Sequence, residues 1–167
     1  TIVKEVGKVE KMLVRGVTRD NDVARISVKG LDDTPGKAFQ VFSILAKHGV
    51  NVDVILQSAG SDNTNNISFT VAKANVKLAV EKIEENLERI GAQTVEADDS
   101  VSKVSIVGSG MSSNAGVAAK MFEALYDKNI NIQMISTSEI KVSVIISEAE
   151  AERAVVAVHD KFDLGRQ

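Results

Sequence analysis

The residues best suited to chemistry lie in one stretch, 30–57, where an acid stands directly before a predicted helix. Asp33 and Thr34 precede Pro35, which is the only proline of the sequence, and Gly36 follows it. A fixed φ suits proline to the first turn of a helix, and either Asp33 or Thr34 can cap a first-turn N–H group. Because Gly36 has no side chain, the other first-turn donors are predicted to stay accessible.

Accessible helix donors and nearby acids together predict a site for a small molecule that carries both charges. The N-terminal end of a helix favours a carboxylate or a phosphate, and Asp33 and Asp53 can accept bonds from an ammonium group. A free amino acid has both of these groups. The same residues are also typical of a plain turn followed by a helix cap, so the local sequence leaves both interpretations open.

The stretch occurs twice in the chain. A shift of 80 positions aligns Gly30, Gly36, Ala38, Phe42, Leu45, Asn51, Ile55 and Ser58 with Gly110, Gly116, Ala118, Phe122, Leu125, Asn131, Ile135 and Ser138. One insertion is needed, because the segment 61–66 of the first copy has little counterpart in the second. That segment is predicted to be a longer surface loop. A repeat of this length indicates a duplicated small domain and not a solenoid.

Apolar periodicity predicts the helices and strands of both copies. In the first copy, strands are expected at 23–29, 50–57, 67–73 and 93–97, with helices at 36–48 and 75–90. In the second copy, strands are expected at 101–107, 130–136 and 141–147, with helices at 115–128 and 150–162. The second copy therefore has no fourth strand of its own.

A further strand predicted at 12–18 has no place in the first copy, which is already complete. We expect it to close the sheet of the second copy. The first module, 23–98, is then inserted in sequence within the second, which is formed by 12–18 plus 101–164. The order βαββαβ is typical of an α+β ferredoxin-like module, with an antiparallel sheet and helices on one face.

Composition argues against several classes of protein. The 167 residues have a net charge of −3 and no basic cluster, which argues against a nucleic-acid partner. There is no cysteine, and the two histidines are far apart in sequence, so no metal site and no cofactor are expected. No apolar run approaches the roughly 20 residues that span a bilayer, so a cytoplasmic location without membrane contact is expected. A chain that starts at Thr1 is typical of a fragment.

Four motifs, in this order within paired βαββαβ modules, carry a family resemblance. They are Asp33-Thr-Pro-Gly36, Asn51-Val-Asp53 with Gln57, Val107-Gly-Ser-Gly-Met111 and Ile135-Ser-Thr-Ser-Glu139. Over about 12–164 the chain resembles the tandem ACT domains of aspartate kinase. Thr34 stands where that family most often has lysine, and Asn66 stands where it commonly has an acid. The Lys-Phe-Gly-Gly motif of the amino-acid kinase domain is absent from the sequence, so no catalytic residue and no kinase activity of this chain alone are expected.

The resemblance implies a regulatory chain that binds L-threonine, L-lysine or both, and conveys feedback inhibition to the catalytic domain or subunit of an ATP-dependent aspartate kinase. It implies a homodimer in which the effector lies between the first module of one chain and the second module of its partner. The first-module residues are Asp33, Pro35, Gly36, Lys37, Ala38, Asn51, Val52, Asp53 and Gln57. The partner-side residues are Asn129, Ile130, Asn131 and Ile132.

Within this implied site, N–H groups after Pro35 bind the effector carboxylate, Asp33 and Asp53 bind its ammonium, and Gln57 binds a hydroxyl. A second, pseudo-equivalent site is implied at Met111, Ser112, Ser136, Thr137, Ser138 and Glu139. The alternative for that second set is a helix cap followed by a packed strand.

Two other classes of function remain. The same modules can sense an amino acid for a different enzyme or a transporter, because a fold does not fix a function. A ferredoxin-like enzyme, such as an acyl-phosphate hydrolase, or an RNA-binding module shares the topology. No histidine, cysteine or convergent acid pair falls beside a plausible nucleophile, which argues against an enzyme. RNA binding is disfavoured because Phe69, the one aromatic on a predicted central strand, lies on its apolar face.

Overall fold

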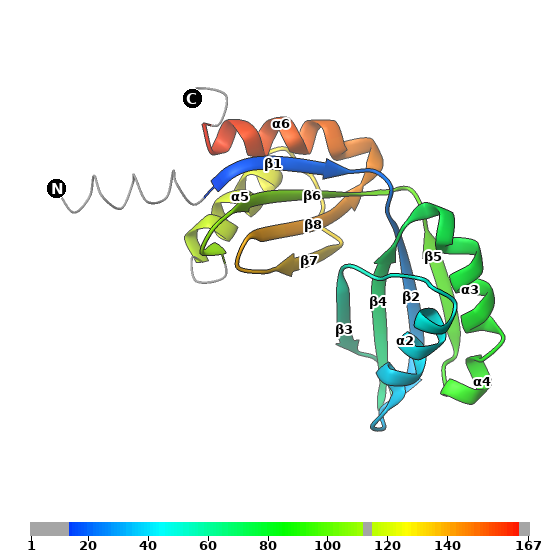
Figure 1. Ribbon diagram of the computed structural model, residues 1–167. Coiled ribbons are helices and arrows are strands. Elements are labelled where there is room, and N and C mark those ends of the chain that lie inside the picture. The colour runs from blue at the N-terminus through cyan, green and yellow to red at the C-terminus, as the bar shows by residue number, and fades with distance from the viewer. Residues whose placement is uncertain (1–13, 112–114, 164–167) are drawn as a thin grey trace. The chain divides into compact units, whose positions relative to one another are not determined.

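The computed structural model describes residues 14–111 and 115–163, which fold as two compact units (Figure 1). The inserted unit is Asp22–Ser100. The outer unit combines the described residues of the segments 1–21 and 101–167. Each unit contains one four-stranded sheet in which neighbouring strands are antiparallel.

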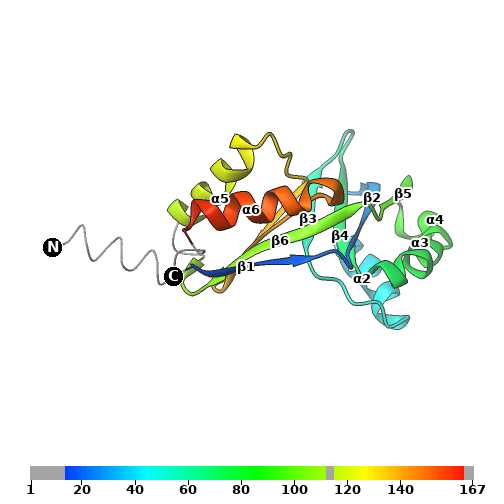
Figure 2. The same ribbon diagram turned by 90° about the horizontal axis from the view of Figure 1, so that it is seen from above.

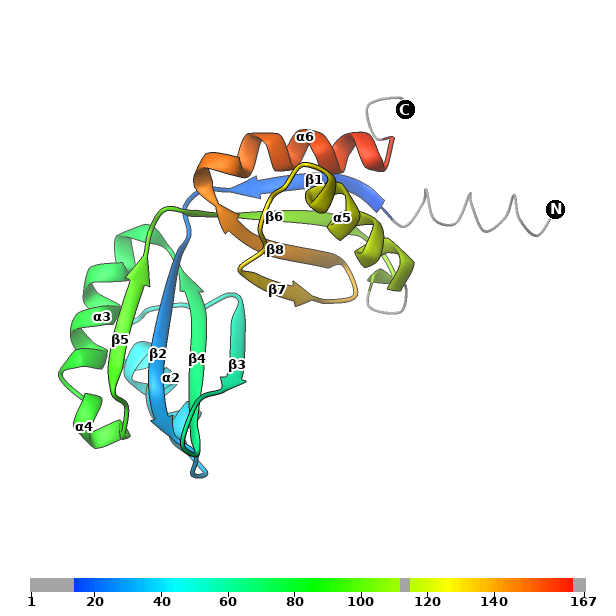
Figure 3. The same ribbon diagram turned by 180° about the vertical axis from the view of Figure 1, so that it is seen from behind.

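The inserted unit has its strands in the order β3-β4-β2-β5. Its elements are β2 (Ala24–Asp32), α2 (Lys37–Lys47), β3 (Ile55–Ala59), β4 (Thr64–Val71), the short 3-10 turn η1 (Lys73–Asn75), α3 (Val76–Glu84), α4 (Leu87–Ile90) and β5 (Thr94–Asp98). The helices α2 and α3 cover one face of this sheet, as Figure 3 shows from behind. The expected ferredoxin-like module is therefore present.

The core of the inserted unit follows from two apolar periodicities. Ala24, Ile26 and Val28 of β2 are buried in alternation, as expected of a strand with one covered face, and the register shifts between Val28 and the buried Leu31. On α2 the buried residues Val41, Ile44 and Leu45 form one stripe. Phe42 beside this stripe meets Phe69 of β4 edge to face, with ring centroids 5.5 Å apart.

The outer unit has its strands in the order β1-β6-β8-β7. Its elements are β1 (Val14–Asp20), β6 (Val101–Gly108), α5 (Ala115–Asp127), β7 (Met134–Thr137), β8 (Lys141–Ser147), the 3-10 turn η3 (Glu148–Glu150) and α6 (Ala151–Lys161). Seen from above, α5 and α6 lie side by side over one face of this sheet (Figure 2). Their buried residues form a core with those of β6 and β8.

The strand β1 occupies the edge of the outer sheet beside β6. It is antiparallel to β6, with pairs that run from Val14 opposite Gly108 to Asp20 opposite Lys103. Val14 is 2% exposed and belongs to the core of the outer unit. The strand expected at 12–18 thus runs over Val14–Asp20, while residues 12 and 13 lie outside the described residues. In the outer sheet β1 lies at the edge beside β6, just as β5 lies at the edge beside β2 in the inserted sheet.

Two expected strands begin later than predicted, and one expected helix is divided. The strands expected at 50–57 and 130–136 begin only at Ile55 and Met134. Before β3, the Val54 N–H donates to the Thr70 hydroxyl at 3.0 Å and not to a backbone carbonyl, while the Asp53 N–H and the Val54 carbonyl still bond to the backbone of Thr70. The helix expected at 75–90 is divided into α3 and α4. The side chain of Asn86 donates to the Lys82 carbonyl at 2.7 Å and so takes the acceptor that the next helical turn would use.

Candidate functional site

The loop from β2 into α2 leaves the start of the helix without a side-chain cap. The cap position is Gly36, with a left-handed φ of 90°, and no side chain bonds to the first turn. The prediction that Asp33 or Thr34 caps the helix is therefore wrong. Helix geometry leaves the first-turn N–H groups, beginning with Lys37 and Ala38, without acceptors inside the helix. The donors expected for an anion are thus present.

The hairpin between β3 and β4 holds this loop in place. Asn65 Nδ2 donates to Asp33 Oδ1 at 2.8 Å. The Asp33 N–H donates to the Asn63 carbonyl at 3.2 Å, and the Gly30 N–H donates to Asn66 Oδ1 at 3.0 Å. The segment present only in the first copy thus contacts the candidate site directly. Sequence reasoning placed it on the surface but did not assign it this role, although three asparagines beside a predicted site were an available signal.

The residue that follows α4 holds the same loop from its other side. The Asp32 N–H donates to the Gly91 carbonyl at 3.0 Å, and Gly91 has a left-handed φ of 73°. A Cβ atom at Gly91 would overlap the Asp32 carboxylate and approach Lys37 Nζ to 3.4 Å. A side chain at this position therefore requires both the left-handed backbone conformation and a movement of the Asp32 side chain.

The substitution Gly91→Ala is expected to destabilise the inserted unit and to displace the Asp32 side chain. Adoption of the left-handed conformation by a non-glycine residue costs roughly 1–2 kcal/mol. Gly49→Ala is the matched control, because Gly49 has a similar φ of 71° but a Cβ atom there would meet nothing within 4 Å. Urea unfolding should show a larger loss for Gly91→Ala than for Gly49→Ala. Equal losses would show that the loop contact has no energetic weight.

Strand register separates two acids that the sequence placed in one site. Asp33 follows the end of β2, whereas the Asp53 N–H bonds to the carbonyl of Thr70, which pairs with Arg25 near the start of β2. A strand of this length spans roughly 25 Å. The interpretation that Asp33 and Asp53 of one chain bind the same ammonium group is therefore wrong.

The other first-module candidates divide between these two ends of the sheet. Asn51 and Asp53 are exposed before β3, and Val52 packs partly against the core. Gln57 is exposed on the edge strand β3 and pairs with Ile67. Because β3 ends opposite Asn65, Gln57 lies toward the end of the sheet that carries Asp33.

The partner-side candidates lie between α5 and β7. Asn129 ends the turn after α5 with a left-handed φ of 56°, and its N–H donates to the Tyr126 carbonyl at 2.9 Å. Ile130 is buried in the core of the outer unit, and Ile132 packs partly against that core. Only Asn129 and Asn131 expose their side chains here.

The second candidate set is built differently from the first. The Met111 side chain is 2% exposed and packs in the core of the outer unit. The Met111 N–H donates to the Glu139 carbonyl at 2.9 Å. The hydroxyl of Ser138 accepts the Lys141 N–H at 3.1 Å and so stabilises the turn between β7 and β8. Ser136 is half-buried and Thr137 is exposed. Ser112 lies outside the described residues.

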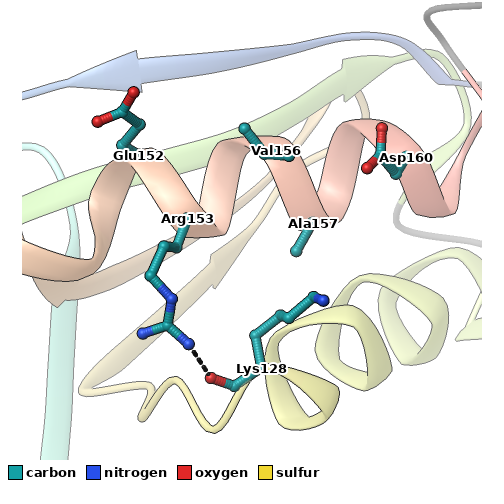
Figure 4. Close-up of a pocket in the computed structure, with 6 residues that line it drawn as sticks. All are labelled: Lys128, Glu152, Arg153, Val156, Ala157 and Asp160. Carbon is teal, nitrogen blue, oxygen red and sulfur yellow. Dashed lines mark hydrogen bonds between the residues drawn. The ribbon is translucent and has the colours of Figure 1, made fainter.

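A hollow of about 390 Å³ lies in the outer unit between the end of α5 and α6 (Figure 4). It is lined by Lys128, Glu152, Arg153, Val156, Ala157 and Asp160, none of which was a sequence candidate. Arg153 donates to the Lys128 carbonyl at 2.5 Å, so its guanidinium binds the end of α5. At the C-terminal end of α6, the hydrogen bond from Lys161 lowers the pKa of the Glu123 carboxyl. These contacts join two helices and do not converge on a ligand.

The described part of the chain lacks two other features that would indicate a function. Residues 14–111 and 115–163 contain no group of three or more His, Asp or Glu side chains that could hold a metal ion. Within those ranges, no helix has the length and apolar character needed to cross a membrane.

The ACT domain model matches residues 26–87 and 104–162, one segment in each unit. The chain belongs to the ACT domain family. It is 44% identical over 164 residues to an aspartokinase from Pseudomonas aeruginosa. The aligned residues are 98% of this chain and 40% of the relative. Aspartokinase 2 of Bacillus subtilis is 40% identical over 167 residues, or 99% of this chain and 41% of the relative. The ACT chain thus spans about two fifths of the length of these curated relatives.

Two solved structures resemble the ACT chain over nearly their whole length. A structure of aspartokinase alpha and beta subunits matches with a TM-score of 0.84 and 46% identity, over 90% of this chain and 99% of that one. The ligand-free regulatory subunit of aspartate kinase from Thermus thermophilus matches with a TM-score of 0.85 and 42% identity, over the same shares. The two ACT modules therefore correspond to the regulatory region of aspartate kinases.

Proposed function

We propose that this chain senses an amino acid for an aspartate kinase, binds L-threonine or L-lysine, and conveys feedback inhibition to a catalytic domain or subunit. The observation that supports this most directly is the uncapped start of α2 beside the carboxylate of Asp33. Both units of the chain are ACT modules, so the chain alone is proposed to have no kinase activity.

The two ends of the loop suit the two charges of an amino acid. N–H groups at the start of α2 can donate to the effector carboxylate, and the helix dipole favours that charge. Asp33 can accept bonds from the ammonium group, and these charge-assisted bonds are the stronger ones. Gln57, exposed near the same end of the sheet, can donate to or accept from the threonine hydroxyl.

The separation within the inserted module supports the proposal of a site shared by two chains. The loop before α2 and the segment Asn51 to Asp53 lie at opposite ends of one sheet, so neither completes the site of the other. We propose that Asn129 to Ile132 of a partner chain complete the first-module site in a homodimer. By the same duplication, Asn51 to Asp53 would face the second-module loop of the partner. The exposed Ile55 and Leu56 on edge strand β3 and Ile135 on edge strand β7 supply apolar surface for such a dimer.

Thermal melting with added amino acids is expected to identify the effector. Saturation of the native state at a hundredfold excess over the Kd adds about 2.7 kcal/mol of stability, which raises the Tm by several degrees. L-threonine and L-lysine should produce this shift, and their D-enantiomers are the matched controls. If neither L-amino acid raises the Tm, the effector assignment fails.

A further inference from the structure

We propose that Asn65 is a positioning residue for the effector site, which holds the Asp33 carboxylate in the orientation that receives the effector ammonium group. The inference rests on the proposed function, in which Asp33 binds the effector ammonium group. Asn65 lies outside the loop that would contact the effector and acts on it through Asp33. Its basis is the bond from Asn65 Nδ2 to Asp33 Oδ1 at 2.8 Å.

The chemistry of this contact orients the carboxylate without neutralising it. A carboxylate has two oxygens with about four acceptor positions, and a single amide donor uses one of them. Asparagine carries no charge, so it does not compete with an ammonium group as a lysine or arginine would. Within the described residues, no ion pair involves Asp33, so its charge is available to a ligand.

Asn65 is itself held on a rigid element. It lies on the central strand β4, opposite Ala59 of β3 and Leu31 of β2. The tight turn before it has left-handed residues at Asp62 and Asn63 and is closed by the bond from the Gly60 N–H to the Thr64 carbonyl at 2.8 Å. A side chain placed in this way can fix the direction of the carboxylate it contacts.

At the sequence positions that correspond to Asp33 and Asn65, the second module has neither the acid nor the amide. The shift of 80 positions places Ser113 where the first module has Asp33, and the segment 61–66 has little counterpart. Among the described residues of the second module, backbone bonds attach the loop to its hairpin, from Met111 to Glu139 and from Gly108 to Ile140, both at 2.9 Å. The Asn65 contact thus distinguishes the first-module loop as the one prepared for a cationic group.

The test compares Asn65→Asp with Asn63→Asp by calorimetric titration with L-threonine and L-lysine. Both variants make the same chemical change in the same hairpin, but Asn63 contacts the loop only through its backbone carbonyl. Asn65→Asp replaces the amide donor with a carboxylate that repels the Asp33 carboxylate out of its orientation, and the Kd should rise roughly tenfold or more through this misplacement. Asn63→Asp should change the Kd by less than about twofold, because two exposed charges in water interact weakly. Unliganded melts of both variants establish that they fold.

The swapped variant Asp33→Asn with Asn65→Asp separates positioning from a structural role. The swapped variant can restore the hydrogen bond between residues 33 and 65, but it moves the negative charge onto β4. Hydrogen-exchange protection of the residue 33 N–H should therefore match that of the wild type, while effector binding should stay weak. Binding that returns together with the bond would show a merely structural role and overturn the proposal. Equal affinity of Asn65→Asp and Asn63→Asp would also overturn it. A wild-type chain that binds neither amino acid would instead overturn the proposed function, and the positioning role with it.

Discussion

Deletion of residues 1–20 is expected to unfold the outer unit while the inserted unit stays folded. The deletion removes β1 from the sheet edge and exposes the ladder groups of β6. Burial of Val14 alone is worth roughly 1.5–3 kcal/mol, against a typical total of about 5–15 kcal/mol for a domain. Ser102 also loses its acceptor on β1, the Asp20 carbonyl at 3.1 Å.

Hydrogen exchange measures both units in one experiment. Protection should be lost at 104–107 and 142–146 but kept at 26–28 and 67–71, which serve as the internal control. A peptide with the sequence of residues 12–21 should restore protection at 104–107 by pairing with the open edge, and a scrambled peptide should not. Unchanged protection in the outer unit after the deletion would show that β1 is dispensable, and that residues 101–164 form the second module by themselves.

The substitution Asp33→Asn is expected to weaken effector binding about tenfold or more while the fold stays intact. Bonds to a charged group contribute about 1.5–3 kcal/mol, and the variant removes the charge that the ammonium would contact. The unliganded chain should tolerate the change, because Asp33 is exposed and does not cap α2. Asp62→Asn is the matched control, since it removes a charge from an exposed position in the adjacent hairpin.

A site shared by two chains also links effector binding to dimerisation. An effector that needs both chains must favour the dimer, with a coupling of about 1–3 kcal/mol, or about 5- to 150-fold in the dimer Kd. Sedimentation velocity over a dilution series should show this tightening with L-threonine or L-lysine for wild type and Asp62→Asn, but not for Asp33→Asn. A wild-type chain that binds effector as a monomer would contradict the shared site.

The sequence was sufficient to predict the architecture because the relevant signals are local and repeated. Alternation along β2 and the stripe on α2 each report one buried face, and the shift of 80 positions makes every such signal occur twice. Element ends were less predictable. The Val54 N–H bonds to the Thr70 hydroxyl just before β3, and the Asn86 side chain bonds to the Lys82 carbonyl at the break after α3. Both of these are single hydrogen bonds that periodicity does not report.

For the candidate site, the sequence by itself determined which residue types gather around the start of α2, and the tandem ACT family to which they belong. Only the tertiary structure decided their partners. In the structure the cap position of α2 is Gly36. The Asp33 carboxylate instead accepts a hydrogen bond from Asn65, because a hairpin distant in sequence reaches the loop. It also placed Asp53 at the far end of the sheet from Asp33, because the register of β4 with β2 and β3 fixes which ends meet. Such long-range pairing depends on chain geometry across the whole sheet, which residue types and spacing do not contain.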